Sequence, residues 1–506
     1  MLAAGIAAVI LILVGLEQYL SVYAHRRLID ALKEHYQSDV QVGSIRISLF
    51  PPFRATLEGL EFRHHGRRDV PPLITIRRAS ASVGIIGLLQ SPKRVREVTL
   101  EGLQIHIPPR GEKRPEDDRD HSRKERQSRS PFVIGTIVAD GTKLMVLPRK
   151  SGKEPLEFDI RRLRLQAVGI YRPMEFDAEL RNAKPPGNIR SHGRFGPWAA
   201  DDPGETPVSG DFTFKDADLS VFHGIAGILS SQGSYSGKLN RLEVQGTTDT
   251  PDFMVRNSGH ALDLKTEYSA TVDGTDGDTY LHPVTGHFLR STVVANGSVA
   301  GTPGVKGKTV ALDATVEDGR VEDMLRLAVQ SDQPALTGSI SFRSKIVIPP
   351  GDADIMDKLQ LDGTFGVASG HFTNSETQQK VATLSRRAQG DTEDAGGGNV
   401  ASKFAGAFVL HHGTLHFSHL RFTIPGATIS LTGDYGMRSR EIDLTGEARM
   451  EAKVSEMTTG VKSFFLKLVD PLFEKKDAHA GAVIPIHIHG DRSQPSVGLD
   501  LGKVLK

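Results

Sequence analysis

The sequence lacks cysteine, lacks an excess of either charge and lacks a second long apolar run, and each absence narrows the possible functions. Without cysteine the chain forms no disulfide and no thiolate metal site, so its fold is indifferent to the redox state of its compartment. The 62 basic residues nearly equal the 61 acidic ones, so electrostatics gives no reason to expect a nucleic-acid partner. Aromatic residues are 6% of the chain and Trp198 is its one tryptophan, which leaves few large side chains to fill a wide core.

The one long apolar run covers residues 1–16 and predicts a transmembrane anchor over residues 1–23. A spanning helix needs about 20 apolar residues, a length that is reached if Tyr19 and Tyr23 lie at the membrane interface. A cleaved signal peptide and a buried core helix are the alternatives, but no basic residue precedes the run and no Ala-x-Ala site follows it. Basic residues such as Arg26 would by themselves place the following chain in the cytoplasm, so charge alone leaves the topology open.

After this segment, apolar and polar residues alternate in many short runs, which predicts a mainly β protein. Residues 40–62 fit a strand, a break and a second strand, and residues 98–107 fit a strand with a bulge at Gly102. Many of the 52 glycines separate such runs, as is typical of hairpin turns. Because helices do not alternate with the strands, we expect an antiparallel sheet that continues through residues 131–384 and 401–506.

A few other segments interrupt the strand pattern. Residues 217–230 and Val321–Ala328 are predicted to be short helices. Residues 110–130 hold eight basic and six acidic residues without one aliphatic side chain, so we interpret them as a disordered charged loop. The alternative, a polybasic site for a partner, is disfavoured because the interleaved acidic residues cancel most of the field. A flexible glycine-rich loop is predicted at residues 385–400.

Residues 455–476 have the clearest helical periodicity of the chain. A helix packed on the end of the sheet is the main interpretation, and an interfacial membrane helix or a plug of a groove are the alternatives. Pro471 is expected to kink or end the regular part of this helix. Its predicted apolar face consists of Val461, Phe464, Phe465, Leu468 and Leu472.

Two segments have a superficial likeness to enzyme motifs. Residues 301–309 end like a phosphate-binding loop, but the spacing is one residue too long and a strand pattern follows where a helix is required. Residues 233–237, GSYSG, place tyrosine where a nucleophile elbow needs serine, so we interpret them as a glycine-bounded turn. We therefore predict that the chain is not an enzyme and uses no cofactor.

Two groups of possible metal ligands also have simpler interpretations. Asp273, Asp276 and Asp278 lack the spacing and the closing glutamate of a calcium loop, so a hairpin turn is favoured. His487 and His489 lie on the same side of a predicted strand but have no acidic partner nearby in the sequence, which favours solvated histidines over a metal site.

Several segments of the chain resemble the AsmA-like family. Residues 44–62 (SIRISLFPPFRATLEGLEF) and 79–107 (ASASVGIIGLLQSPKRVREVTLEGLQIHI) are similar to its N-terminal region, here residues 24–109. Residues 413–455, followed by VKSFFLKLVDPLF and IPIHIHGDRSQPSVGLDL, are similar to its C-terminal domain. The segments GSYSGKLNRLEVQGTTDTPDF and DGTDGDTYL resemble middle parts of its smaller members.

This resemblance implies a protein anchored in a bacterial inner membrane by one helix, with most of the chain in the periplasm as a long curved β-sheet groove. It also implies phospholipid transport between membranes and outer-membrane homeostasis, with phospholipids as ligands and envelope proteins as possible partners. An apolar groove would act by passive shielding of acyl chains. Roughly 25 strands at about 4.8 Å would give a groove on the order of 120 Å long.

Alternation alone does not distinguish an open groove from a face filled by its own side chains. The low aromatic content favours the open groove. The alternative function is a non-catalytic scaffold or assembly factor for outer-membrane proteins, which would bind them through sheet edges and loops. The predicted groove-lining residues are Leu163, Leu165, Leu262, Leu264, Phe422 and Ile424.

Overall fold

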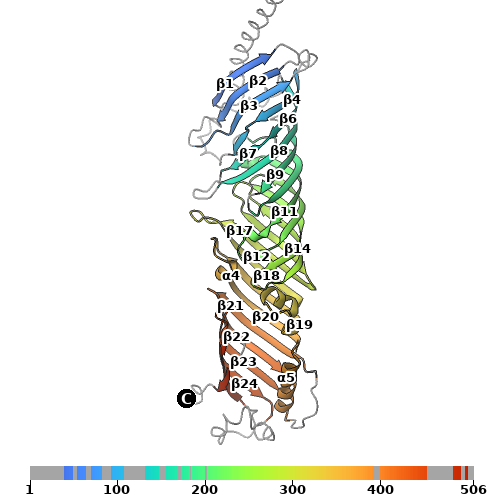
Figure 1. Cartoon of the computed structure of the whole chain (residues 1–506), viewed down its shortest axis with the longest axis vertical. Coiled ribbons are helices and arrows are strands. Elements are labelled where there is room, and N and C mark those ends of the chain that lie inside the picture. Colours follow the sequence, from blue (N-terminus) through green and yellow to red (C-terminus); the bar gives the residue numbers. More distant parts are fainter. Residues whose placement is uncertain are drawn as a thin grey trace, which may run out of the picture.

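The computed structural model describes residues 39–48, 54–63, 70–82, 93–107, 132–147, 155–168, 172–182, 184–199, 202–390, 399–452, 483–491 and 496–499. They form one elongated sheet of 26 strands, which confirms the mainly β prediction (Figure 1). The predicted anchor, the charged loop at 110–130 and the predicted helix at 455–476 lie outside these residues. Within the described ranges, we find no helix with the length and apolar content that a membrane span requires.

The strands follow the predicted alternating runs closely. The first nine are β1 (Asp39–Ser48), β2 (Arg54–Arg63), β3 (Ile74–Ser82), β4 (Lys93–Glu101), β5 (Gln104–Ile107), β6 (Phe132–Asp140), β7 (Thr142–Val146), β8 (Leu156–Val168) and β9 (Met174–Asn182). The next nine are β10 (Gly187–Phe195), β11 (Pro207–Asp218), β12 (Ile225–Ala226), β13 (Ile228–Lys238), β14 (Arg241–Val255), β15 (Ala261–Val272), β16 (Thr279–Phe288), β17 (Ser291–Gly301) and β18 (Lys308–Arg320). The last eight are β19 (Leu336–Ile348), β20 (Gln360–Phe372), β21 (Ser402–His411), β22 (Thr414–Ile424), β23 (Ala427–Gly436), β24 (Glu441–Met450), β25 (Val483–Asp491) and β26 (Ser496–Leu499).

Neighbouring strands pair antiparallel except at one place near the N-terminal end. There β4 pairs with β6, and β5 with β7, in parallel. The expectation of a wholly antiparallel sheet is therefore wrong at this point, because residues 108–131 supply the long connection that a parallel pair needs. The predicted bulge at Gly102 is a break between β4 and β5, and the register against β3 is the same on both sides of it.

Short helices lie in some of the connections. They are η2 (Pro203–Glu205), η3 (Leu219–Val221), α3 (Val321–Ala328), α4 (Ile355–Lys358) and α5 (Ser375–Ala388). The prediction of α3 is confirmed. The helix predicted at residues 217–230 is wrong, because Gly224 and Gly227 adopt positive φ angles and the chain forms η3 and then strands β12 and β13 instead.

Helix α5 was not predicted and overlaps the loop predicted at 385–400. The Asn374 side chain caps its first turn by accepting a hydrogen bond from the Thr377 N–H at 2.9 Å. Ala382, Ser385 and Ala388 are its buried residues. Residues 385–388 therefore belong to a packed helix. The sequence did not predict this helix because most of the neighbouring residues are polar and give no apolar periodicity.

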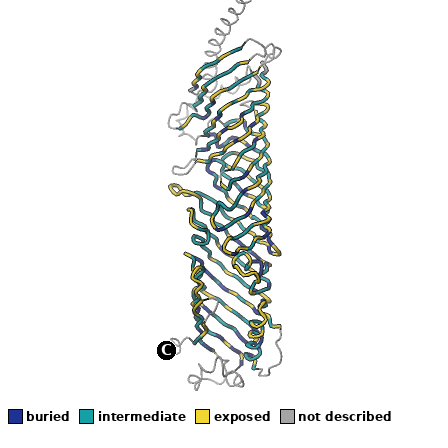
Figure 2. Tube along the Cα trace, viewed as in Figure 1, coloured by how far each residue is buried: buried dark blue, intermediate teal, exposed yellow. Residues whose placement is uncertain are grey.

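Apolar side chains gather in three clusters along the length of the sheet. One lies in β3 to β9 around Leu163, a second lies beneath α3 around Ile340, and the third lies in β22 to β25 beneath α5 around Ile424. Figure 2 shows exposed and half-buried residues alternating along most strands, as expected for a single sheet with two unlike faces.

Candidate functional site

The six predicted groove residues all project from the same side of the sheet. Leu163 in β8 lies opposite Ala178 in β9, and the register continues through Ser191 in β10 and Phe212 in β11. Followed strand by strand to β22, it places Leu163, Leu165, Leu262, Leu264, Phe422 and Ile424 on one face, which we call the apolar face. The alternate side chains form the polar face.

These six residues differ in how far they are covered. Leu163, Leu262 and Ile424 are buried, with 8%, 5% and 3% of their surface exposed. Leu165, Leu264 and Phe422 are half-buried. Within the described part of the chain, α3 and α5 pack against parts of the apolar face and no second sheet covers it. The half-buried residues therefore keep apolar surface that a ligand can cover.

The two ends of the apolar face are strongly hydrophobic. The N-terminal section, β1 to β9, is lined by side chains such as Leu60, Leu100, Leu144, Phe176 and Leu180 around its buried cluster. In the C-terminal section, β18 to β25, Phe404 and Phe422 lie opposite each other with ring centroids 4.9 Å apart. Leu410, the most buried large side chain there, is 2% exposed. Both ends present surfaces suited to hydrocarbon chains.

The middle section, β10 to β16, presents a different surface on the same face. Glycines occupy its centre, and aromatic rings from the adjacent strand lie over them. A Cβ on Gly246 would be 2.9 Å from the Tyr268 hydroxyl, and one on Gly210 would be 3.0 Å from the Tyr235 hydroxyl. Both tyrosines are the registered partners of these glycines. Glycine is required here because a Cβ would approach the tyrosine hydroxyl of one neighbouring strand and, still more closely, a backbone carbonyl oxygen of the other, that of Gln232 for Gly246 and that of His192 for Gly210.

Each of these tyrosines reaches one strand further to a serine. The Tyr235 and Ser191 hydroxyl oxygens are 2.8 Å apart, and those of Tyr268 and Ser231 are 3.1 Å apart. Both serine hydroxyls donate to backbone carbonyls, so each serine oxygen accepts from its tyrosine. Burial raises the pKa of Tyr235 and of Tyr268, so both phenols stay protonated donors at neutral pH.

In the middle section, the ends of strands on one long side of the sheet contact the ends of later strands on the other long side. Near the start of β8, Leu156 Cδ2 would lie 3.2 Å from a Cβ on Gly277, which is in the turn between β15 and β16. Farther along, the His223 carbonyl accepts a hydrogen bond from the Ile355 N–H of α4 at 3.0 Å. Each contact joins the end of one strand to a turn or helix that comes much later in the chain and lies on the other long side of the sheet. The sheet is thus a coil whose turns touch.

Helix α3 is held at the sheet edge by two buried carboxylates. Glu322 pairs with Arg290 at 2.7 Å and with Arg320 at 3.0 Å, and it accepts from the Gly338 N–H at 3.1 Å. Asp323 accepts from the Ser291 hydroxyl at 2.8 Å. Burial alone would raise the pKa of Glu322, but the backbone hydrogen bonds and Arg320 outweigh it and lower this pKa below its ordinary value.

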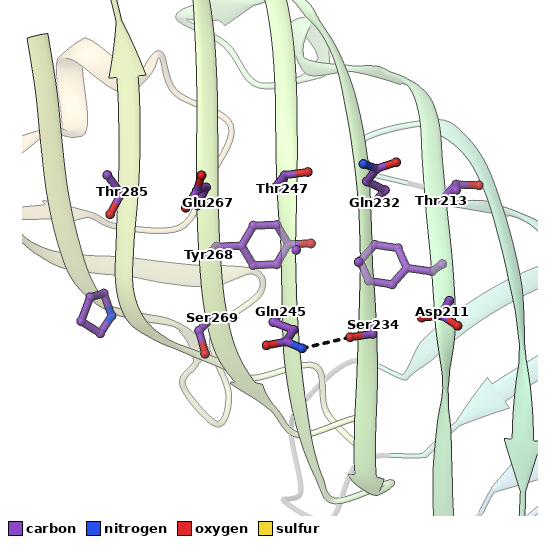
Figure 3. A pocket seen from close by; sticks show the side chains of 14 residues that line it. Asp211, Thr213, Gln232, Ser234, Gln245, Thr247, Glu267, Tyr268, Ser269 and Thr285 are labelled. Carbon is purple, nitrogen blue, oxygen red and sulfur yellow. Dashed lines mark hydrogen bonds between the residues drawn. The ribbon is translucent and has the colours of Figure 1, made fainter.

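The polar face of the middle section carries rows of hydrophilic side chains. Figure 3 shows a shallow depression there, with one row of labelled residues above another. The upper row is Thr213, Gln232, Thr247, Glu267 and Thr285, and the lower row is Asp211, Ser234, Gln245 and Ser269. Arg190 and Glu179, 3.4 Å apart, extend the first row toward β8. These two rows suit water and polar ligands, while Phe212, Tyr268 and Pro283 give the same depression an apolar component.

The other segments considered from sequence have structural roles. Residues 233–237 lie inside β13, so the predicted turn there is wrong. Gly233 stands within the strand because a Cβ there would lie 3.0 Å from the Phe212 ring of β11. Asp273, Asp276 and Asp278 form the predicted hairpin turn between β15 and β16.

The two C-terminal histidines do meet, with ring centroids 4.7 Å apart. Asp443 of β24, which the sequence did not reveal as a partner, lies 2.7 Å from His487 Nε2. Among the described residues, no group of three or more His, Asp or Glu side chains has the geometry to hold a metal ion. The predicted face of residues Val461, Phe464, Phe465, Leu468 and Leu472 lies outside the described ranges.

Comparisons with protein-family models, with curated proteins and with solved structures gave no match.

Proposed function

We propose that the chain is a β-groove protein that shields the acyl chains of phospholipids along the apolar face of its sheet. The observation that carries this proposal is a single register that keeps one set of side chains on one face from β1 to β25, and this set is apolar and in part half-buried at both ends of the sheet. Acyl chains would cover this surface while the headgroups remain in water, and the gain comes from removing apolar surface from water.

The cellular setting belongs to the same proposal. The apolar run at residues 1–16 would anchor the chain in the inner membrane of a bacterium, and the sheet would extend into the periplasm. The resemblance to the AsmA-like family supports a role in phospholipid transport between membranes and in outer-membrane homeostasis. No chemical step is involved, since shielding requires only an apolar surface.

Lipid recovery after mild detergent extraction tests this function. The full-length protein is expected to carry phospholipid, and Leu165→Asp is expected to reduce the amount, because a charge on the half-buried apolar face opposes an acyl chain. The matched control is Gln166→Asp, which places the same charge on the exposed polar face of the same strand.

Two results would contradict the proposal. Phospholipid at background level in the unaltered protein would favour the alternative function, a scaffold that binds outer-membrane proteins through its edges and loops. An equal loss of lipid in both variants would show that the faces do not differ in lipid binding.

A further inference from the structure

The centre of the middle section mixes hydroxyl groups with hydrocarbon on its apolar face, where Phe212 and Val244 lie among serine and threonine side chains. Ser191, Ser231, Thr248 and Thr266 all lie on its apolar face, in line with apolar residues of β8 and β9. The Thr248 and Thr266 hydroxyl oxygens are 2.6 Å apart and hydrogen-bond to each other. Each of these hydroxyls already has a hydrogen-bond partner, so an acyl chain is disfavoured where it would separate the hydroxyls from those partners.

The space in front of these hydroxyls is also narrow. Leu156 at the start of β8 contacts the turn between β15 and β16, so the sheet curls round on itself within the seven paired strands β8, β9, β10, β11, β13, β14 and β15 and encloses an interior there. The rings of Tyr235 and Tyr268 lie across this interior, over the glycines of the adjacent strands. Their hydrogen bonds to Ser191 and Ser231 hold the rings in that position.

We propose that the middle section is a polar constriction that divides the apolar face into two acyl-binding compartments, and that Tyr235 and Tyr268 set the boundary between them. This inference rests on the proposed function, because it concerns where the shielded chains lie. One compartment is the N-terminal section, where Leu165 and Phe176 are half-buried. The other is the C-terminal section, where Phe404 and Phe422 are half-buried.

The division makes the two tyrosines the determinants of where a chain stops. A chain that crosses must displace both rings and break both tyrosine–serine hydrogen bonds without replacing them. We expect occupancy of the middle section to be lower than that of either end by about tenfold, which corresponds to about 1.4 kcal/mol.

A photoreactive palmitic acid analogue tests this directly on the full-length protein in mild detergent. After irradiation, the labelled residues are mapped by peptide mass spectrometry. Labels are expected on apolar-face residues of β8, β9, β21 and β22, with about tenfold less label per residue in β13 to β15. Comparable labelling in all three sections would overturn the constriction and leave the proposed function intact. Absence of label from every section would overturn both.

Two double variants identify the boundary residues. Tyr235→Ala with Tyr268→Ala removes both rings and should raise labelling of β13 to β15 toward the level of the ends. Tyr235→Phe with Tyr268→Phe is the matched control, since it keeps the rings and removes only the hydroxyls. An alanine variant that folds, judged by its unchanged labelling of the ends, and still excludes label from the middle would refute the role of the tyrosines. If that variant does not fold, the labelling map of the unaltered protein still decides whether the constriction exists.

Discussion

The end sections and the middle section use the same strand geometry to build two different surfaces on one face. At the ends, leucine, isoleucine and phenylalanine side chains stand on the sheet and pack into clusters. In the middle, glycines leave room for tyrosine rings of adjacent strands, and hydroxyls satisfy one another. Period-two alternation therefore specifies which residues of a strand share a face, and the side-chain type at each position specifies what that face binds.

The largest effect is expected where a charge enters an end cluster. Ile424→Asp should lower the free energy of unfolding by several kcal/mol, because Ile424 is 3% exposed and packed among apolar residues. Thr266→Asp, on the half-buried hydroxyl-lined middle section, should cost only about 1 kcal/mol. Chemical denaturation of both variants measures the difference. Equal losses would mean that the two sections are packed alike.

A substitution at the centre of the middle section should have the next largest effect. Gly246→Ala places a Cβ 2.5 Å from the Gln232 carbonyl oxygen and 2.9 Å from the Tyr268 hydroxyl, so we expect a loss of about 1–3 kcal/mol from overpacking. Gly498→Ala in β26 is the control, since no atom lies within 4 Å of its Cβ. Thermal melting should separate the two, and a neutral Gly246→Ala would argue against the ring contact.

A smaller effect on stability is expected when the pH is lowered and Glu322 of α3, in the C-terminal section, becomes protonated. Because the pKa of Glu322 is lowered in the folded state, its contribution is present above the ordinary glutamate pKa of about 4.3 and is lost as the pH falls through the folded pKa. The stability difference between the unaltered protein and Glu322→Gln should therefore be constant near neutral pH and shrink below about pH 4. A difference that grows with acidity would contradict the assigned direction.

The smallest effect on the free energy of unfolding is expected from a substitution on the polar face. Arg190→Ala removes the ion pair with Glu179, and the arginine side chain is largely exposed, so we expect a change of about 0.5 kcal/mol or less. Denaturation in low and high salt checks this, because an exposed pair is screened by salt. A loss above about 2 kcal/mol would show that the polar face is packed and not solvated.

The sequence predicted the faces better than the connections. Alternation in β8, β15 and β22 placed each pair of groove residues on one face of its own strand, and the register between strands places the three pairs on the same face of the sheet. Helix α5 was not predicted because it has few apolar residues, and its one helical signal in the sequence is the capping residue Asn374. The parallel pairing of β4 with β6 was not predicted, because the relative direction of two paired strands depends on the length of the connection between them and not on the residues of the strands.

The proposed constriction was not predicted from the sequence for a different reason. Tyr235 stands between glycines in GSYSG, a pattern that in isolation is typical of a turn. Its actual partners, Gly210 and Ser191, come from two earlier strands. The signal that could have revealed it is the recurrence of glycine and an aromatic residue at matching positions of consecutive strands, which becomes visible once the register is known.

Site-specific photocrosslinking in cells distinguishes the two faces of the sheet by what binds to each. Probes at Leu165 and Phe422 report on the apolar face of the two ends, and probes at Gln166 and Arg421 report on the polar face of the same strands. We expect phospholipid adducts from the first pair of probes and none above background from the second pair. Adducts that contain only protein from Leu165 and Phe422, or equal lipid adducts from both faces, would contradict this expectation.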